Sequence, residues 1–316
     1  MIKKILAVVL AVFMVLSLTA CKKDIYNFQL VKDDRYYAIS KVLDDKLEKA
    51  VIDSEHEGKM VVAILNRTFR SIKTLKEVHI PSNLCIIGAD AFIGCSNLQK
   101  TNYIGDIEEW GYIEFANSGA NPTSYSRDLY VNDNLITEIN LQKATKINGY
   151  AFFNCKSIKT VNVGETVQSI GQASFANCVG LTSVNLSNSI SGISDETFSN
   201  CQNLEKITFG ENLFMIGNNA FNGCVKLEEI STLKKVSSIG DFAFYGCEKI
   251  TSISLPSTLV NIGESAFYNT GIKTIIFDGT TLQFGRIDKV DGWGRGIEDA
   301  VIICTDGTLQ VDEFIK

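Results

Sequence analysis

Cysteine is the residue with the widest chemistry in this sequence, and five of the nine cysteines recur at a spacing of 23 residues. These five are Cys155, Cys178, Cys201, Cys224 and Cys247. Thiols at regular spacing could bind a metal, carry redox chemistry or form disulfides. Strands about 4.8 Å apart would bring neighbouring cysteines within bridging range, so distance alone does not exclude disulfides. No C-x-x-C pair supports a zinc or redox site. We interpret the five as small buried apolar side chains and predict free thiols.

The histidines and carboxylates show no catalytic pattern. His56 and His79 are the two histidines, and neither lies beside a nucleophile motif. The sequence has no G-x-S-x-G, no H-E-x-x-H and no glycine-rich phosphate loop. The adjacent Glu228 and Glu229 are explained by a solvated surface. We therefore predict no enzyme activity, no catalytic residue, no metal ligand and no cofactor. The net charge of −6 provides no basic stripe for nucleic acid.

A further cysteine, Cys21, follows an N-terminal targeting pattern. Lys3 and Lys4 precede the apolar run 5–18, which is shorter than the roughly 20 apolar residues that a spanning helix needs. Residues 1–20 are therefore predicted to be a signal peptide. The end of this segment, Leu18-Thr19-Ala20-Cys21, resembles the lipobox of bacterial lipoproteins. The resemblance implies that Cys21 is lipidated, that residues 21–27 are a tether, and that the protein is exported and anchored to the membrane, facing outward. The alternative is an ordinary signal peptide with a chance cysteine.

The aromatic and aliphatic residues keep the same period as the cysteines. Phenylalanines recur from Phe152 to Phe267, and isoleucines five residues ahead of each recur from Ile147 to Ile262. The unit is C-x-x-L-x-x-V-x-L, a variable turn, then I-G-x-x-A-F-x-x-C. One unit buries too few side chains to offset the conformational entropy of ordering it, so it must stack on its neighbours. A fixed period of this length predicts a solenoid of repeats.

The rest of the chain is divided by departures from this period. We expect an N-terminal hairpin cap over 28–60, the first repeats over 61–104, an insert over 105–137, further repeats over 138–278 and a second cap over 279–316. The repeat pattern gives eight turns. In the insert, residues 129–136 suggest a hairpin, and Trp110, Tyr112 and Phe115 either pack on neighbouring turns or bind a ligand.

The repeat unit resembles the BspA-type leucine-rich repeats of bacterial surface proteins. The closest matches to the motif are 178–186 and 262–267, and the resemblance covers nearly all of 28–307. It implies a leucine-rich repeat solenoid with short parallel β-strands on one face, short turns or helical turns on the other, and β-rich caps. The sequence departs from the motif at single positions, which are Asn148, Ser174, Ser194, Thr197 and Thr232.

In such strands the apolar positions point inward and the residues between them form outward rows. The outward rows are rich in hydroxyl and amide groups, with charges of both signs. The candidate ligand-binding residues are Thr160, Asn162, Ser183, Asn185, Lys206, Thr208, Glu229, Ser252 and Ser254. The alternative is that Ser and Thr merely satisfy strand preference and solubility.

These features predict a lipid-anchored cell-surface protein that binds macromolecules. The expected partner is a host or extracellular protein or glycan, in an adhesion-like role that the family resemblance implies. The alternative is an envelope scaffold, or a module that binds a partner protein without a host ligand.

Overall fold

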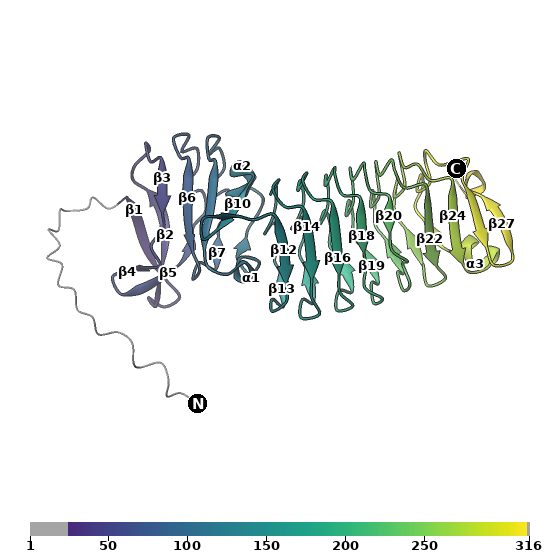
Figure 1. The fold of residues 1–316 in the computed structure, drawn as a ribbon, viewed down its shortest axis with the longest axis horizontal. Coiled ribbons are helices and arrows are strands. Elements are labelled where there is room, and N and C mark those ends of the chain that lie inside the picture. The colour runs from purple at the N-terminus through teal and green to yellow at the C-terminus, as the bar shows by residue number, and fades with distance from the viewer. Residues whose placement is uncertain (1–24, 315–316) are drawn as a thin grey trace, which may run out of the picture.

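The computed structural model describes residues 25–314, which form one elongated solenoid (Figure 1). The predicted leucine-rich repeat fold is confirmed, with mostly parallel strands and few helices. The solenoid has about 12 turns, and the eight counted from the repeat pattern leave out the caps and the insert. The predicted signal peptide and Cys21 lie outside the described residues. Within 25–314, no helix is long and apolar enough to span a membrane.

One side of the solenoid is a face of parallel strands, hereafter the strand face. Most turns contribute one strand each, and one turn contributes both the strand at 129–131 and the strand at 138–141; the outward side chains form the surface. The strands in chain order are β3 (Lys49–Val51), β6 (Glu77–Pro81), β8 (Lys100–Ile104), β10 (Leu129–Val131), β12 (Glu138–Leu141), β14 (Thr160–Val163), β16 (Ser183–Leu186), β18 (Lys206–Thr208), β20 (Glu229–Ile230), β22 (Ser252–Pro256), β24 (Thr274–Asp278) and β26 (Val301–Cys304). They belong to three successive sheets, which divide after β10 and after β20.

A second ladder of strands, most of them two residues long, runs beside the strand face. Its members are β2 (Tyr36–Val42), β5 (Lys59–Ile64), β7 (Ile86–Ile87), β9 (Glu114–Phe115), β13 (Lys146–Ile147), β15 (Ser169–Ile170), β17 (Gly192–Ile193), β19 (Met215–Ile216), β21 (Ser238–Ile239), β23 (Asn261–Ile262) and β25 (Asp288–Lys289). In the central repeats each strand ends on the isoleucine of the motif, and that isoleucine is buried. The isoleucine of the I-G pair is therefore the last residue of each short strand, and its side chain lies in the core.

The tight turn between the motif phenylalanine and cysteine depends on the residue before the cysteine. Asn154, Asn177 and Asn200 there have positive φ, and later turns use Gly223 and Gly246. Asn and Gly tolerate this left-handed conformation better than other residues do. The sequence thus encodes the turn as directly as it encodes the core.

The core is a column of stacked phenylalanines flanked by the motif cysteines. Phe152, Phe175, Phe198, Phe221, Phe244 and Phe267 are fully buried. Neighbouring ring centroids in this column are 5.1–5.8 Å apart with nearly parallel planes. Edge-to-face aromatic contacts occur at both ends of the aromatic core, where Tyr26 meets Phe69 and Trp293 meets Phe267.

Both ends of the solenoid are covered by non-repeat elements. At the N-terminal end, β1 (Tyr26–Val31) pairs antiparallel with β2 across a turn in which Lys32, Asp33 and Asp34 have positive φ. The short β4 (Glu55–His56) pairs with β5. At the C-terminal end lie α3 (Thr281–Gly285), β27 (Gly307–Gln310), which pairs antiparallel with β26, and the 3-10 helix η1 (Val311–Phe314).

The segment 105–137, expected to be an insert, continues the solenoid in part. β9 pairs in parallel with β7, and β10 pairs in parallel with β8. The remainder holds α1 (Ile107–Trp110), α2 (Thr123–Ser126) and β11 (Asn134–Leu135), which forms a hairpin with β10. Trp110 and Phe115 are buried and the Trp110 indole donates to the Ala151 carbonyl at 2.7 Å, so these aromatic residues serve packing. Period counting missed this turn because its spacing is irregular.

Candidate ligand-binding face

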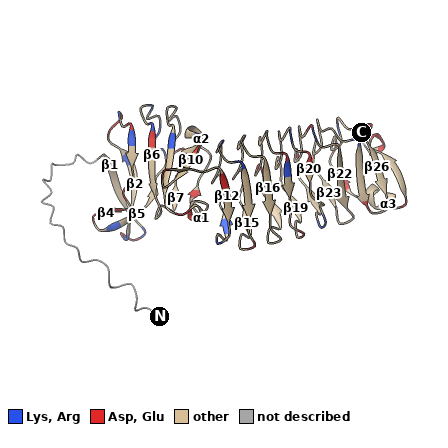
Figure 2. Cartoon of the chain, in the orientation of Figure 1, with Lys and Arg blue, Asp and Glu red and all other residues tan. Residues whose placement is uncertain are grey.

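The centre of the strand face carries two in-register rows of the predicted residues. Thr160, Ser183, Lys206 and Glu229 pair along one row, and Asn162, Asn185 and Thr208 pair along the next. All seven side chains are exposed or half-buried, whereas the valines between them, such as Val161 and Val184, are buried. The alternation predicted from the sequence is therefore present. β14 and β16 carry no charged residue, as Figure 2 shows.

Charge enters these rows at β18 and β20. Lys206 Nζ lies 2.9 Å from Glu229 Oε2, and both side chains are more than half exposed. An ion pair in this setting contributes about 0–1 kcal/mol to stability and is screened by salt. Both charges thus remain available to a ligand at small cost.

Ser252 and Ser254 do not continue these rows, contrary to the expectation of one continuous surface. They lie in β22, which belongs to the next sheet and pairs with β24. The cause is Thr232, which stands where other repeats place an inward aliphatic residue. Thr232 is exposed, and Leu233, one residue later, is buried in its place. A shift of one residue reverses the direction of every side chain in a strand, so β20 ends and the sheet divides.

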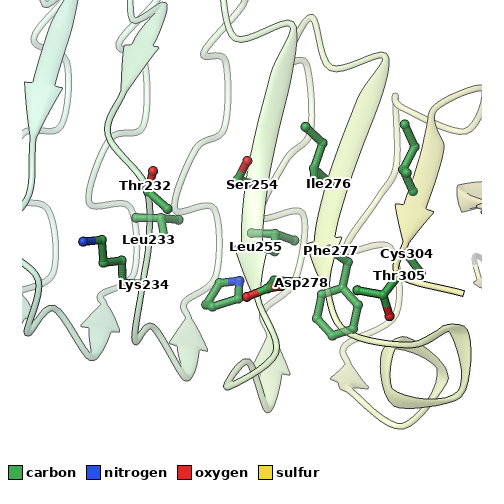
Figure 3. Close-up of a pocket in the computed structure, with 12 residues that line it drawn as sticks. Thr232, Leu233, Lys234, Ser254, Leu255, Ile276, Phe277, Asp278, Cys304 and Thr305 are labelled. Atoms are coloured by element: carbon green, nitrogen blue, oxygen red, sulfur yellow. The ribbon is translucent and has the colours of Figure 1, made fainter.

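A depression opens in the strand face where the sheet divides (Figure 3). It has a volume of about 430 Å³, and a smaller hollow of about 110 Å³ adjoins it at Thr232, Leu233 and Ser254. The residues that line the larger depression include Leu233, Leu255, Pro256, Ile276, Phe277 and Ile303. The other lining residues are Cys304 and the polar Thr232, Lys234, Ser254, Asp278 and Thr305, so seven of the twelve are apolar and the depression is more apolar than the centre of the face.

The N-terminal part of the strand face holds a charged cluster, hereafter the Glu77 network. Its members are Lys49, Glu77, His79, Lys100, Asn102 and Asp133. The Glu77 carboxylate is central, with His79 Nε2 at 2.6 Å, Lys49 Nζ at 3.2 Å and Lys100 Nζ at 3.3 Å. Burial raises the pKa of Glu77, but hydrogen bonds from His79, Lys49 and Lys100 outweigh it and lower the pKa to about 2.

The same network ties the hairpin of β10 and β11 to the face. Lys100 Nζ lies 2.7 Å from Asp133 Oδ1, and Asn102 Nδ2 donates to the same oxygen at 2.9 Å. The Lys100 ammonium also lies 5.1 Å from the ring centroid of Tyr130. The network is satisfied by its own members, which fits a role in holding the hairpin in place.

Sequence reasoning missed both the Glu77 network and the apolar depression. A signal for the first existed, since a step of 23 residues from Glu77 and His79 arrives at Lys100 and Asn102, their strand partners. The depression had a weaker signal. Ile276 and Ile303 are aliphatic residues at outward positions, and the sequence shows the departure from the motif at Thr232. Whether these residues line one depression depends on how the sheet divides.

The two histidines contact other side chains of the chain, and the motif cysteines are buried. The His56 ring stacks on Phe28 at 3.7 Å between centroids, and the His79 ring nitrogens contact Glu77 and Asn102. Between residues 25 and 314, no group of three or more His, Cys, Asp or Glu side chains could hold a metal ion. The cysteines Cys95, Cys155, Cys178, Cys201, Cys224 and Cys247 are free and buried, away from the face.

Stacked turns with a face of short parallel strands and a buried ladder of motif side chains define a leucine-rich repeat protein. The chain belongs to the family of the BspA type leucine-rich repeat region, whose family model matches six copies over residues 47–122, 123–236 and 215–286.

Comparison with solved structures agrees with this fold. A leucine-rich repeat protein from Bacteroides ovatus has 23% sequence identity and a TM-score of 0.62, over 89% of this chain and 70% of that one. A leucine-rich repeat protein from T. pallidum has 22% identity and a TM-score of 0.44, over 64% and 88%. The pneumococcal vaccine antigen PcpA has 18% identity and a TM-score of 0.44, over 77% and 62%. No curated protein sequence matches the chain.

Proposed function

We propose that this protein is exported, anchored by lipid at Cys21, and binds an extended macromolecule, either a protein or a glycan, through its strand face. The observation that carries the proposal is the pair of in-register polar rows on β14, β16 and β18. Parallel pairing repeats equivalent side chains about every 4.8 Å, and the rigid ladder holds them in place before a ligand arrives. Hydroxyl and amide groups at fixed spacing suit a ligand with repeated polar groups.

A binding experiment with matched variants tests the site. The chain from Lys22 onward, made without lipid, would be screened on arrayed glycans and extracellular matrix proteins. One variant carries Asn162→Lys and Asn185→Lys, which places two charges on exposed positions of the strand face. The control carries Gln168→Lys and Ser191→Lys, which places the same charges on the same two turns beside the short-strand ladder.

We expect a ligand that the face variant loses and the control keeps. Equal binding by both variants would contradict a site at these rows. If no ligand binds, purification of the protein with an endogenous envelope partner would favour the scaffold alternative.

The anchor requires a separate test, because Cys21 lies outside the described residues. The support for it is the Leu18-Thr19-Ala20-Cys21 pattern, and a multiply acylated cysteine would give durable attachment where one chain would not. We expect metabolic labelling with an alkyne fatty acid to mark the wild-type protein and not Cys21→Ala. Equal labelling of the two would contradict lipidation at Cys21.

A further inference from the structure

The strand face changes character between β20 and β22. β22 is the first strand of its sheet and pairs only with β24. The backbone groups of β22 that point toward β20 therefore pair with no strand. Beside this edge lie the side chains of Thr232, Ser252 and Ser254, all exposed. The preceding turn, at 230–233, lies across this edge over a hollow of about 110 Å³, and the unbroken pairing of β19, β21 and β23 keeps the two turns stacked, so an added strand has no room here.

An apolar depression directly adjoins this edge. Ile276 and Ile303 pair in register on β24 and β26, and their exposures are 46% and 45%. Ile276 also pairs in register with Ser254. The equivalent outward positions at the centre of the face carry Asn and Thr. At about 430 Å³, the depression lies within the range of about 300–1,000 Å³ typical of ligand pockets.

The rim of the depression carries one charge of each sign, at Lys234 and Asp278. Lys234 is paired with Glu211 at 2.5 Å, and in Figure 3 its side chain points away from the other labelled residues. Asp278 follows Phe277 and is exposed. It forms no ion pair with any residue between 25 and 314. The depression thus combines an apolar wall with one carboxylate that has no ion-pair partner among the described residues.

We propose that this depression binds an extended polypeptide segment in which an apolar side chain lies beside a lysine or arginine. The proposal rests on the proposed function and assigns a protein, rather than a glycan, as the ligand of the C-terminal part of the face. The apolar side chain covers Ile276 and Ile303, and the cation reaches Asp278. A glycan would instead place hydroxyl groups against the two isoleucines, and those hydroxyl groups would have no hydrogen-bond partners there.

The test uses short Ser/Thr peptides that differ in one central pair: Leu-Arg, Leu-Asp or Ser-Arg. Their affinities for the chain from Lys22 onward are measured by fluorescence anisotropy. We expect Leu-Arg to bind most tightly. Ile276→Lys should weaken it by about tenfold or more, because the apolar contact is lost and a like charge is added. Asp278→Lys should weaken Leu-Arg by about fivefold and make Leu-Asp the preferred peptide.

Two control variants match these substitutions away from the depression. Met215→Lys, at 44% exposure in β19, matches Ile276→Lys, and Asp291→Lys, at an exposed position after β25, matches Asp278→Lys. Both should leave the peptide affinities unchanged. The reversal of preference by Asp278→Lys is the decisive result, since a loss of folding would weaken all three peptides alike.

The outcomes also separate this proposal from the proposed function. Equal affinities for Leu-Arg and Ser-Arg, or no change of preference in Asp278→Lys, would overturn the peptide site. A second result would also overturn the peptide site: the protein binds none of the peptides but binds a glycan or matrix protein, and the Asn162/Asn185 variant loses that binding. The proposed function would then stand. A protein that binds none of these probes contradicts both.

Discussion

At the scale of single residues, the cysteine ladder is explained by a hydrogen bond as well as by size. Four of the five thiols, all but that of Cys155, donate to the carbonyl oxygen of a phenylalanine on the preceding turn, with Cys201 Sγ 3.2 Å from the Phe175 oxygen and Cys224 Sγ 3.2 Å from the Phe198 oxygen. The same carbonyls also accept a backbone N–H, as Phe175 does from Cys178, so alanine would remove the thiol hydrogen bond without leaving the carbonyl unpaired. Valine or leucine would overfill the position. Cysteine satisfies both requirements in a small volume.

Burial in this ladder should make the thiols unreactive. It raises the pKa of Cys155 and of Cys224 to about 12, so almost no reactive thiolate forms at neutral pH. We expect iodoacetamide to modify the exposed Cys85 in the native protein and to reach the ladder cysteines only after denaturation. Mass spectrometry of digested, alkylated protein measures this. Ladder peptides linked by disulfides, or alkylated in the native state, would contradict the prediction of free, buried thiols.

Ser174 and Thr197 occupy the position where other repeats have alanine, and they differ in their hydrogen bonds. Ser174 is fully buried and its hydroxyl has no partner between residues 25 and 314, whereas Thr197 Oγ1 donates to the Ser194 carbonyl at 2.7 Å. We expect Ser174→Ala to stabilise the protein by about 1 kcal/mol, and Thr197→Ala to destabilise it by about the same amount. Urea unfolding of both variants measures the difference. Destabilisation of Ser174→Ala would show that its hydroxyl has a partner in solution.

At the scale of elements, the Glu77 network joins β3, β6, β8 and the hairpin of β10 and β11. The folded-state pKa of Glu77 is about 2, below its ordinary value of 4.5. The unfolded chain therefore binds this proton more tightly than the folded chain does. The stability that Glu77 contributes is fully present above about pH 4.5 and is lost as the pH falls through about 2.

Glu77→Gln tests this linkage. The variant removes the charge, so the difference in free energy of unfolding between wild type and variant should be largest above pH 4.5 and should shrink as the pH falls toward 2. Urea unfolding across this pH range measures the difference. A constant difference at all pH values would show that Glu77 acts through packing and not through its charge.

The elements that follow the period were predictable, and those that interrupt it were not. Stacking places residues 23 apart side by side, so the rows of Thr160 and Asn162 follow from the sequence alone. The segment 105–137 stands apart from the period in the sequence because its β9 and β10 pair with earlier strands at irregular spacing. The depression was missed because Ile276 and Ile303 form a site only where the sheet divides, which depends on the shift from Thr232 to Leu233.

At the scale of the whole molecule, stability should be distributed along one dimension. Each turn contacts only its neighbours, so local substitutions act on a few turns and not on the entire fold. The aromatic core runs along this axis and meets Trp293 at its C-terminal end, where Phe284 and Phe314 complete the cover over the last turn. An end cover and a central residue should therefore differ in the extent of their effects.

Two substitutions of similar size compare these positions. Trp293→Ala removes the cover and Phe198→Ala creates a cavity in the middle of the column, and each should cost about 3–5 kcal/mol locally. Hydrogen exchange resolves where that cost appears. We expect Trp293→Ala to lower protection over β24, β26 and β27 and to leave β14 and β16 unchanged, because fraying at one end does not cross the intact turns between them. Phe198→Ala should instead lower protection in β16, β18 and β20 while both ends stay protected. Equal loss of protection along the whole chain in either variant would show that the solenoid unfolds as a single cooperative unit.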